Sequence, residues 1–365
     1  METSCRRLLV SASQTSCRRL LRRGLKSSAA APPQELSSTA PPPPASWTES
    51  VAGRGATPAP SPLLPHATHV SVVGCGFVGA NTALALLQRN ICSRITLTDV
   101  DDDKVRGEVL DLEDAAAPGR ISAGTPRDAG TADVVVVTAG RGQRPGETRL
   151  DLIGANAKIL ESCLAAMGPI NPAAKIVVVA NPCDPLAFHA ARLAGLPAGA
   201  VFGSGTVLDS RRLKVALAGR LGVHHGAVDL AVLGEHGDSQ FAAYSLATVG
   251  GIPLRAYPGV GAVDLDAEAT AAAHKAYDII GKKKYTAYGV ANATADIVDA
   301  ILNDRKAVLP VSVKVPGRDC NISLPSVVGY GGVEATGDIR PHLDAAEVAK
   351  YDETVAKMEA MVAAL

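Results

Sequence analysis

The chain has 365 residues, and its 36 Lys and Arg balance its 36 Asp and Glu, so the formal net charge is zero. This length buries a substantial core and favours two packed subdomains, while the neutral balance argues against nucleic acid or an anionic membrane as the partner. Hydrophobic residues make up 47% of the chain but aromatic residues only 3%. Small aliphatic side chains suit buried parallel strands covered by helices, so we expect an α/β fold that binds a small molecule.

The cysteine and histidine patterns do not predict a metal site. Seven cysteines are scattered without paired spacing, which favours a reduced intracellular compartment over a disulfide framework. His224 and His225 have no cysteine or carboxylate cluster beside them, so we expect them at the surface. No apolar run approaches the roughly 20 residues that span a bilayer, so no membrane segment is expected.

Residues 1–66 are predicted to be a disordered extension. Residues 3–9 recur as residues 15–21, and no acidic residue lies between Glu2 and Glu35. A basic segment without acidic residues is typical of an organellar transit peptide, and a disordered basic tail without a targeting role is the equal alternative. The proline clusters between residues 41 and 65 predict an extended linker.

A glycine-rich turn follows the first predicted strand, residues 70–73. The turn, Gly74-Cys75-Gly76-Phe77-Val78-Gly79, opens a predicted helix over 80–88, and a second strand over 95–98 ends at Asp99. This context favours a dinucleotide-binding site over a tight glycine turn without a ligand. A pyrophosphate would meet the helix N-terminus, and Asp99 would accept from a ribose 2′-hydroxyl and repel a 2′-phosphate. NAD is therefore favoured over NADP.

The next elements place polar residues at the ends of strands. A helix over 101–114 and a strand over 133–138 precede the Gly- and Arg-rich loop 140–149. That loop is either a solvated surface loop or a mobile lid that brings Arg149 over a bound anion. A helix over 151–167 and a strand over 175–180 follow, and the strand ends at Asn181. Asn181 is thus expected at the carboxyl edge of the sheet, where α/β proteins bind ligands.

Two short segments carry the candidate chemistry. Asp209 and Arg212 share one face of a helix that begins after residue 206, which indicates either a paired site or an intrahelical surface salt bridge. An apolar run, 227–233, ends at two glycines that bracket Glu235 and His236. A histidine at a strand end can act as an acid or base, although an ordinary turn residue is the alternative.

The remaining chain predicts helices over 264–280 and 285–302, a β hairpin from 307–315 and 321–328, and a last helix over 345–365. Alternating strands and helices thus give way to longer helices and a late hairpin. We predict a Rossmann-type doubly wound parallel sheet in an NAD-binding domain, 67–205. A C-terminal mixed α+β substrate domain, 206–365, is predicted to follow it.

Several motifs, in this order along the chain, resemble the L-lactate/malate dehydrogenase family and specifically its L-lactate branch. They are the turn Gly74–Gly79, residues 106–112, Gln143–Arg149, Asn181-Pro182-Cys183-Asp184, residues 203–210, Gly234-Glu235-His236-Gly237-Asp238-Ser239 and Leu324-Pro325. The resemblance runs through nearly the whole chain from His69 to the C-terminus.

The resemblance implies roles for four charged side chains. His236 would give a proton to a keto oxygen while a nicotinamide delivers hydride to the carbon. Asp209 would fix the tautomer of His236 and favour its protonated form. Arg212 would bind the substrate carboxylate with its planar guanidinium, and Arg149 would polarise the carbonyl when the lid closes.

Further residues are implied to border the substrate and the cofactor. Asn181 would hydrogen-bond near the carbonyl, and Thr286 would border the substrate. The residues implied to bind NAD are Gly74, Gly76, Phe77, Val78, Gly79, Asp99, Asn156, Ser204 and Val290.

Gln143 lies six positions before Arg149, where the family senses the far side of the keto carbon. A neutral amide suits the methyl group of pyruvate, whereas a cation suits the second carboxylate of oxaloacetate. Gln143 therefore indicates lactate dehydrogenase, although Arg141 and Arg144 nearby leave malate dehydrogenase as the alternative. A non-catalytic NAD-binding structural protein is the alternative of another class.

The family also implies a setting for the enzyme. It would interconvert pyruvate and (S)-lactate in pyruvate metabolism, glycolysis and fermentation, and it would form a homotetramer. A cytoplasmic location follows from the family, and a mitochondrial or plastid location from the Arg-rich N-terminus.

Overall fold

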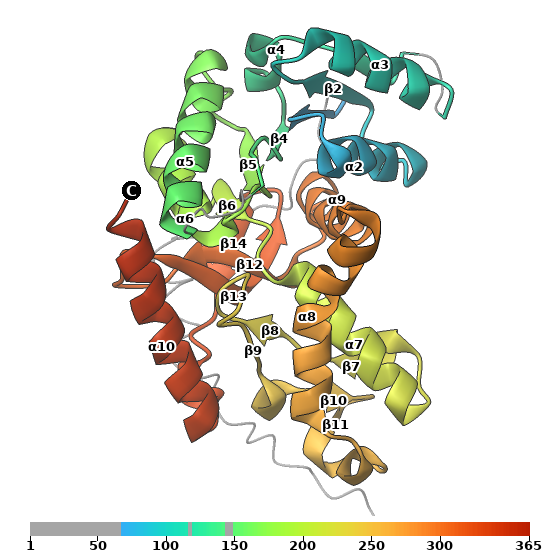
Figure 1. The fold of residues 1–365 in the computed structure, drawn as a ribbon, viewed down its shortest axis with the longest axis vertical. Helices are drawn as coiled ribbons and strands as arrows, with labels where there is room; N and C mark the ends of the chain where they lie inside the picture. The colour runs from blue at the N-terminus through green and yellow to red at the C-terminus, as the bar shows by residue number, and fades with distance from the viewer. Residues whose placement is uncertain (1–66, 116–118, 143–148) are drawn as a thin grey trace, which may run out of the picture. The chain divides into compact units, whose positions relative to one another are not determined.

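The computed structural model describes residues 67–115, 119–142 and 149–365, and the predicted extension lies outside this part of the chain. The first half of the described chain supplies the strands β1 (His69–Val73), β2 (Arg94–Thr98), β3 (Ile121–Ala123), β4 (Val134–Val137), β5 (Lys175–Val178) and β6 (Val201–Gly203). These strands lie side by side in the order β6-β5-β4-β1-β2-β3, and all neighbouring pairs are parallel. The predicted doubly wound parallel sheet is confirmed (Figure 1).

Three later strands extend the same sheet. They are β12 (Ala307–Lys314), β13 (Asn321–Gly329) and β14 (Gly332–Thr336), and they complete a nine-stranded sheet. β12 and β13 form the predicted antiparallel hairpin, and Ser312 of β12 lies opposite Gly203 of β6. The sequence pattern did not indicate that the hairpin joins the parallel strands, because this contact links segments more than 100 residues apart.

The sheet is buried on both faces, as β4 illustrates. Its four valines are all fully buried. Val134 and Val136 pack in one core cluster, whereas Val135 and Val137 pack in a second cluster on the opposite face. A run of valines without polar alternation is what a central parallel strand requires.

Helices connect the parallel strands. They are α2 (Phe77–Gln88), α3 (Asp102–Glu113), α4 (Pro126–Gly130), α5 (Arg149–Ala166) and α6 (Cys183–Leu193). Asp101 caps α3 by accepting from the backbone of Lys104, and Thr125 forms a capping box with Asp128 at α4. The prediction missed α6, whose first turn follows the Asn181-Pro182 turn directly.

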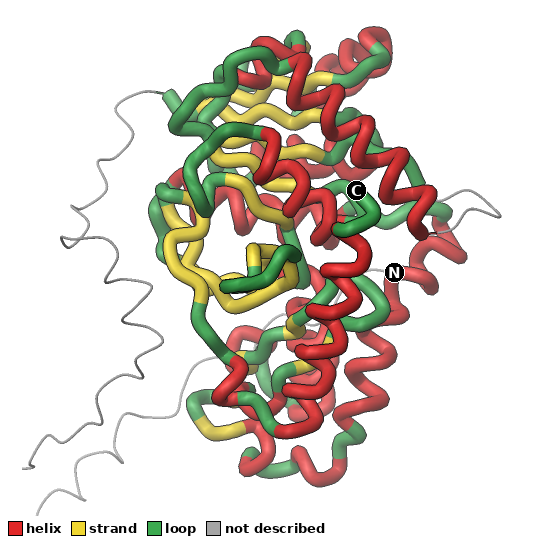
Figure 2. Tube along the Cα trace, turned by 90° about the vertical axis from the view of Figure 1, so that its left-hand side faces the viewer, coloured by secondary structure: helices red, strands yellow, loops and turns green. Residues whose placement is uncertain are grey.

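The second half adds the helices α7 (Val207–Leu221), α8 (Leu265–Lys283), α9 (Tyr288–Leu302) and α10 (Ala345–Val362). The expected strand over 227–233 is instead divided between two small sheets. In one, β7 (Val228–Asp229) pairs with β10 (Thr248–Val249), which also pairs with β11 (Ile252–Pro253); in the other, β8 (Val232–Leu233) pairs with β9 (Phe241–Ala242). Figures 1 and 2 show β10 and β11 well away from the large sheet.

Short 3₁₀ helices complete the second half at His225–Ala227, Tyr244–Leu246, Leu254–Ala256, Val260–Ala262 and Arg340–His342. Within the residues that the structure describes, no helix has both the length and the apolar character needed to cross a membrane.

The glycine-rich turn between β1 and α2 is tightly packed at one glycine and open at another. A Cβ at Gly79 would lie 1.8 Å from the carbonyl oxygen of Gly74 and 2.8 Å from Oγ1 of Thr138. The backbone of Gly74 is itself held in place, because its carbonyl accepts from the Thr138 hydroxyl at 2.8 Å. At Gly76, in contrast, a Cβ would meet no heavy atom within 4 Å.

This difference predicts that one alanine substitution destabilises the fold strongly and the other hardly at all. Gly79→Ala forces the turn apart and is expected to cost about 2–3 kcal/mol or more, since backbone atoms cannot move aside as a flexible side chain does. Gly76→Ala is the matched control, and its free energy of unfolding is expected to lie within about 0.5 kcal/mol of the wild-type value. Thermal or urea unfolding of both variants measures the difference, and equal stabilities would contradict this packing.

Candidate active site

His236 lies in the turn between β8 and β9. Gly234 begins the turn with φ of +89°, a backbone conformation that favours glycine. Gly234 also pairs with Ser323 of β13 through two backbone hydrogen bonds of 3.1 and 2.7 Å. The turn that carries His236 is therefore attached to the large sheet.

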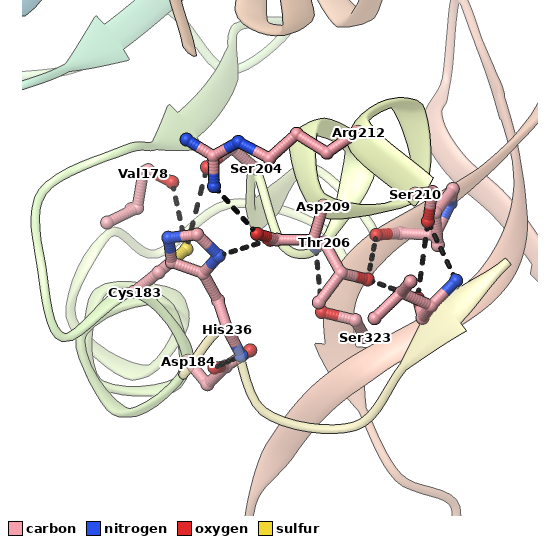
Figure 3. Close-up of polar contacts among 12 residues, drawn as sticks. Val178, Cys183, Asp184, Ser204, Thr206, Asp209, Ser210, Arg212, His236 and Ser323 are labelled. Atoms are coloured by element: carbon pink, nitrogen blue, oxygen red, sulfur yellow. Dashed lines mark hydrogen bonds and ion pairs between the residues drawn. The ribbon is translucent and has the colours of Figure 1, made fainter. Parts of the chain in front are cut away.

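Asp209 lies in the first turn of α7, which begins just after β6 ends. The Oδ2 atom of Asp209 lies 2.7 Å from Nδ1 of His236. An ionised carboxylate can only accept, so this contact places a proton on Nδ1. Figure 3 shows the second ring nitrogen of His236 on the side away from Asp209, where it can donate to or accept from another molecule.

Arg212 lies one helical turn after Asp209, and its Nη1 donates to Oδ1 of Asp209 at 3.2 Å. The side chains of Arg212 and Asp209 keep only 9% and 6% of their exposure, against 24% for His236. The predicted sharing of one helical face is thus confirmed, and the surface salt bridge that was the alternative is excluded by this burial.

Electrostatics favour a charged His236 and a charged Asp209. Burial by itself lowers the pKa of His236, but the charge of Asp209 and its hydrogen bond outweigh burial, so the pKa is raised. Burial likewise opposes ionisation of Asp209, yet the charges of His236 and Arg212 hold its pKa below the usual range. The two directions agree with a carboxylate–imidazolium pair.

The turn is held from two further sides. The backbone N–H of His236 donates to Oδ2 of Asp184, in the first turn of α6, at 2.8 Å. The buried carboxylate of Glu235 accepts from the Ser239 hydroxyl at 2.5 Å and from Nζ of Lys357, on α10, at 2.6 Å. Four elements besides β8 therefore fix the position of this turn: β13, α6, α7 and α10.

A cavity of about 460 Å³ opens beside His236. It brings together eight of the predicted site residues, Val78, Asn181, Ser204, Asp209, Arg212, His236, Thr286 and Val290. A larger cavity of about 1410 Å³ lies between α6, the β12–β14 strands and α10, and none of the predicted site residues lines it.

Asn156, predicted as a cofactor ligand, does not line the smaller cavity. It is buried, and its side-chain amide accepts from the backbone N–H of Arg141 at 3.0 Å and donates to the carbonyls of Arg141 and Asn181 at 3.1 and 2.6 Å. Asn156 thus holds the start of the 140–149 loop against the end of β5, next to the cis peptide bond between Asn181 and Pro182.

The remaining predicted cofactor residues gather around the glycine-rich turn. The Oδ2 atom of Asp99 accepts from the backbone N–H of Cys75 at 2.6 Å, so the carboxylate at the end of β2 lies against the turn that contains Gly74, Gly76 and Gly79. Phe77 is 61% exposed and stacks on Tyr285 with a centroid distance of 3.9 Å. This stacking connects the turn to the segment between α8 and α9.

Gln143 lies outside the described residues. For Arg149 the structure describes only the backbone, which begins α5. The predicted roles of these two residues in the lid stay predictions.

Sequence reasoning did not assign roles to several residues at the site. Asp184 was part of a recognised motif but had no stated function. His274 and Tyr277 of α8 line the cavity, and the Tyr277 hydroxyl donates to Asp238 at 3.0 Å. Lys357 is 122 residues from Glu235 in the chain, so no local pattern could have paired them.

Metal ligands were not predicted, and within the described ranges no group of three or more His, Cys, Asp or Glu side chains could hold a metal ion. His224 and His225 are exposed, as expected.

Two family models match the chain. Residues 68–203 match the lactate/malate dehydrogenase NAD-binding domain, and residues 206–364 match the lactate/malate dehydrogenase alpha/beta C-terminal domain. The chain is 46% identical over 267 residues to L-lactate dehydrogenase A of Rhizopus oryzae, covering 73% of this chain and 83% of that protein. It is 41% identical over 274 residues to the L-lactate dehydrogenase of Synechococcus sp. (strain JA-3-3Ab), covering 73% and 90%.

A solved structure gives the same result. The minor L-lactate dehydrogenase of Enterococcus mundtii superposes with a TM-score of 0.78 at 36% identity, covering 82% of this chain and 98% of that one. The predicted family is confirmed by these matches together with the fold. The chain therefore belongs to the lactate/malate dehydrogenase family, in its L-lactate dehydrogenase branch.

Proposed function

We propose that the protein is an NAD-dependent L-lactate dehydrogenase that interconverts pyruvate and (S)-lactate. The observation that carries this proposal is the pair of half-buried His236 and buried Asp209, 2.7 Å apart, with Arg212 beside it in one cavity. An acid/base next to a buried guanidinium suits a small substrate that carries both a carbonyl and a carboxylate. The relatives that bear the name L-lactate dehydrogenase support the same substrate.

In this reaction the protein's own residues would have the following roles. Arg212 binds the substrate carboxylate with two parallel hydrogen bonds, and Asn181 and Thr286 border the carbonyl and the rest of the substrate. The chemistry that a bound nicotinamide supplies is hydride transfer at the keto carbon. His236 gives its proton from Nε2 to the keto oxygen, and in the reverse direction neutral His236 accepts the lactate hydroxyl proton.

Two residues of the loop 140–149 would complete the site. Arg149 would polarise the carbonyl when the loop closes and excludes water, because a cation acts more strongly in a dry site. Gln143 would face the methyl group of pyruvate. These two assignments rest on the resemblance to the family.

The turn between β1 and α2 fits the pyrophosphate of NAD. Gly76 has open space where a side chain would project, and the N-terminus of α2 adjoins it. Asp99 already accepts the backbone N–H groups of Cys75, Val100 and Asp101, and it would accept from the adenosine ribose through the capacity that remains on its two oxygens. Phe77, Val78, Ser204 and Val290 would border the dinucleotide along the cavity.

Gly76→Ala is expected to keep the fold but to weaken NADH binding roughly 10-fold or more, because the added methyl group projects into the space assigned to the pyrophosphate. Fluorescence titration with NADH measures the dissociation constant. Asn81→Ala is the control. Asn81 lies in the second turn of α2, and its side chain donates to the Phe77 carbonyl. Unchanged NADH affinity in Gly76→Ala would contradict the assigned pyrophosphate site.

Asp209→Asn is expected to lower kcat/KM for pyruvate by about 100-fold or more. The raised pKa of His236 keeps the ring protonated to higher pH, and the loss of the Asp209 charge lowers that pKa. The basic limb of the pyruvate pH profile should therefore move to lower pH. Asp229→Asn is a matched control, since the Asp229 side chain is 86% exposed. If the pyruvate pH profile of Asp209→Asn has its basic limb at the wild-type pH, the pairing of Asp209 with His236 is contradicted.

Malate dehydrogenase is the alternative within the family, and kcat/KM for pyruvate and for oxaloacetate distinguishes the two. We expect the wild type to prefer pyruvate. Gln143→Arg is expected to move the preference toward oxaloacetate by roughly 10- to 100-fold, since a cation pairs with the second carboxylate. Gln143→Met adds no charge and should leave the preference between pyruvate and oxaloacetate unchanged. A wild type that prefers oxaloacetate would overturn the lactate assignment.

A protein that binds NADH but oxidises it with no 2-keto acid would instead be the non-catalytic NAD-binding structural protein. The arrangement of the site favours an enzyme, because the half-buried ring of His236 and the guanidinium of Arg212 both line one cavity beside the carboxylate that pairs with them.

We also propose residues 67–205 as the NAD-binding domain, residues 206–365 as the catalytic domain, and a homotetramer as the assembly. Sedimentation tests the assembly. The proposed location is cytoplasmic, with a mitochondrial or plastid address in residues 1–30 as the alternative. A fluorescent fusion with and without that segment distinguishes the two locations.

A further inference from the structure

Asp184 is a buried carboxylate that contacts the backbone of the acid/base residue, His236. It lies in the first turn of α6 and keeps 1% of its exposure. Its Oδ2 atom accepts the backbone N–H of His236 at 2.8 Å, while the ring of the same histidine contacts Asp209. Figure 3 shows Asp184 near the His236 backbone and Asp209 beside the ring.

A hydrogen bond to a backbone N–H does not by itself require a charge. An asparagine oxygen would accept the same bond without the cost of burying an ionised group. Burial indeed raises the pKa of Asp184 to about 6, and the neighbouring Ser312 hydroxyl, the hydrogen bond from His236 and the charge of His236 limit the rise. Near neutral pH the carboxyl is thus mainly ionised.

Two other carboxylates near His236, Asp209 and Glu235, are each paired with a basic side chain. Asp209 contacts Arg212 on α7 at 3.2 Å, and Glu235 contacts Lys357 on α10 at 2.6 Å. The cation that acts most directly on Asp184 is His236 itself, whose protonation the charge of Asp184 in turn favours. The groups that face His236 are Asp209 and Arg212 from α7, Asp184 from α6, Glu235 and Asp238 from its own turn, and His274 from α8 across the cavity.

We propose that Asp184 is a second positioning carboxylate for His236. Its hydrogen bond fixes the backbone of the histidine, and its negative charge stabilises the protonated ring from the side opposite the substrate. This inference rests on the proposed function, because it assigns Asp184 a part in setting when His236 gives up its proton.

The test removes the charge and keeps the hydrogen bond. Asp184→Asn retains an oxygen of the same size at the same place, so we expect the basic limb of kcat/KM for pyruvate to move to lower pH by about 0.5 to 1 unit. The acid limb of lactate oxidation should move to lower pH by the same amount, since that direction needs the neutral ring. A purely structural role would lower both rates and leave both limbs in place.

Glu347→Gln is the matched control. Glu347 is also buried, and it accepts a backbone N–H, that of Ser245 at 3.0 Å, but it lies on α10 and does not line the cavity. We expect its pH profiles to equal those of the wild type. An equal shift in Glu347→Gln would mean that buried carboxylates act at long range, and would overturn the specific assignment to Asp184.

A second readout does not depend on turnover. NMR titration of histidine-labelled full-length protein gives the pKa of His236 directly, with His236→Gln assigning the resonance. We expect that pKa to fall in Asp184→Asn by the same 0.5 to 1 unit. If Asp184→Asn does not fold, Asp184→Ser supplies a smaller neutral acceptor and carries the same expectation.

The outcomes separate the two proposals. An unshifted His236 titration in a folded, charge-free Asp184 variant overturns the positioning role, whatever the substrate is. A wild type that reduces no 2-keto acid overturns the proposed function, and the NMR comparison still decides the role of Asp184. If neither variant folds, the wild-type His236 titration should show a second inflection near pH 6 as Asp184 protonates, and a single-step curve would contradict the coupling.

Discussion

The site depends on one short contact, the 2.7 Å hydrogen bond between Asp209 and His236. The two residues are 27 positions apart and belong to different elements, a helix and a turn, so the bond forms only if both elements are placed to within a fraction of an ångström. α7 begins immediately after β6, and the turn of His236 pairs with β13, a strand of the same large sheet. One rigid sheet thus sets both ends of the contact.

The histidine turn is supported on the side away from the cavity by α10. Lys357 contacts Glu235, and the Thr354 hydroxyl donates to the carbonyl of Ser239 at 2.9 Å. Removing Lys357 would leave the buried carboxylate of Glu235 without its cation, which is costly in a low-dielectric interior. The last helix of the chain is therefore part of the framework that holds the acid/base residue, although none of its residues lines the smaller cavity.

The sequence was sufficient to predict those features of the structure that depend on a local pattern of residues. The valines of β4, the glycines of the β1–α2 turn and the Asp209–Arg212 spacing each predict their structure from neighbours a few residues away. The resemblance to a family then linked these segments to one reaction. What could not be read was long-range: the joining of β12 to β6, the pairing of Glu235 with Lys357, and the splitting of the 227–233 run between two small sheets. Each depends on a partner that only the folded chain brings near.

The charges at the cavity favour an anionic substrate only when the histidine is protonated. His236 and Arg212 then match the charges of the two carboxylates that contact the histidine, Asp209 and Asp184, while Asp238, which also lines the cavity, adds a negative charge. A substrate carboxylate adds one negative charge, which Arg149 would neutralise in its proposed position over the closed site. If His236 lost its proton first, the closed site would hold a net negative charge in a low-dielectric cavity, where like charges repel strongly. With the proposed roles, binding of a keto acid and protonation of His236 would therefore be coupled, so the state that binds pyruvate would also be the state that can reduce it.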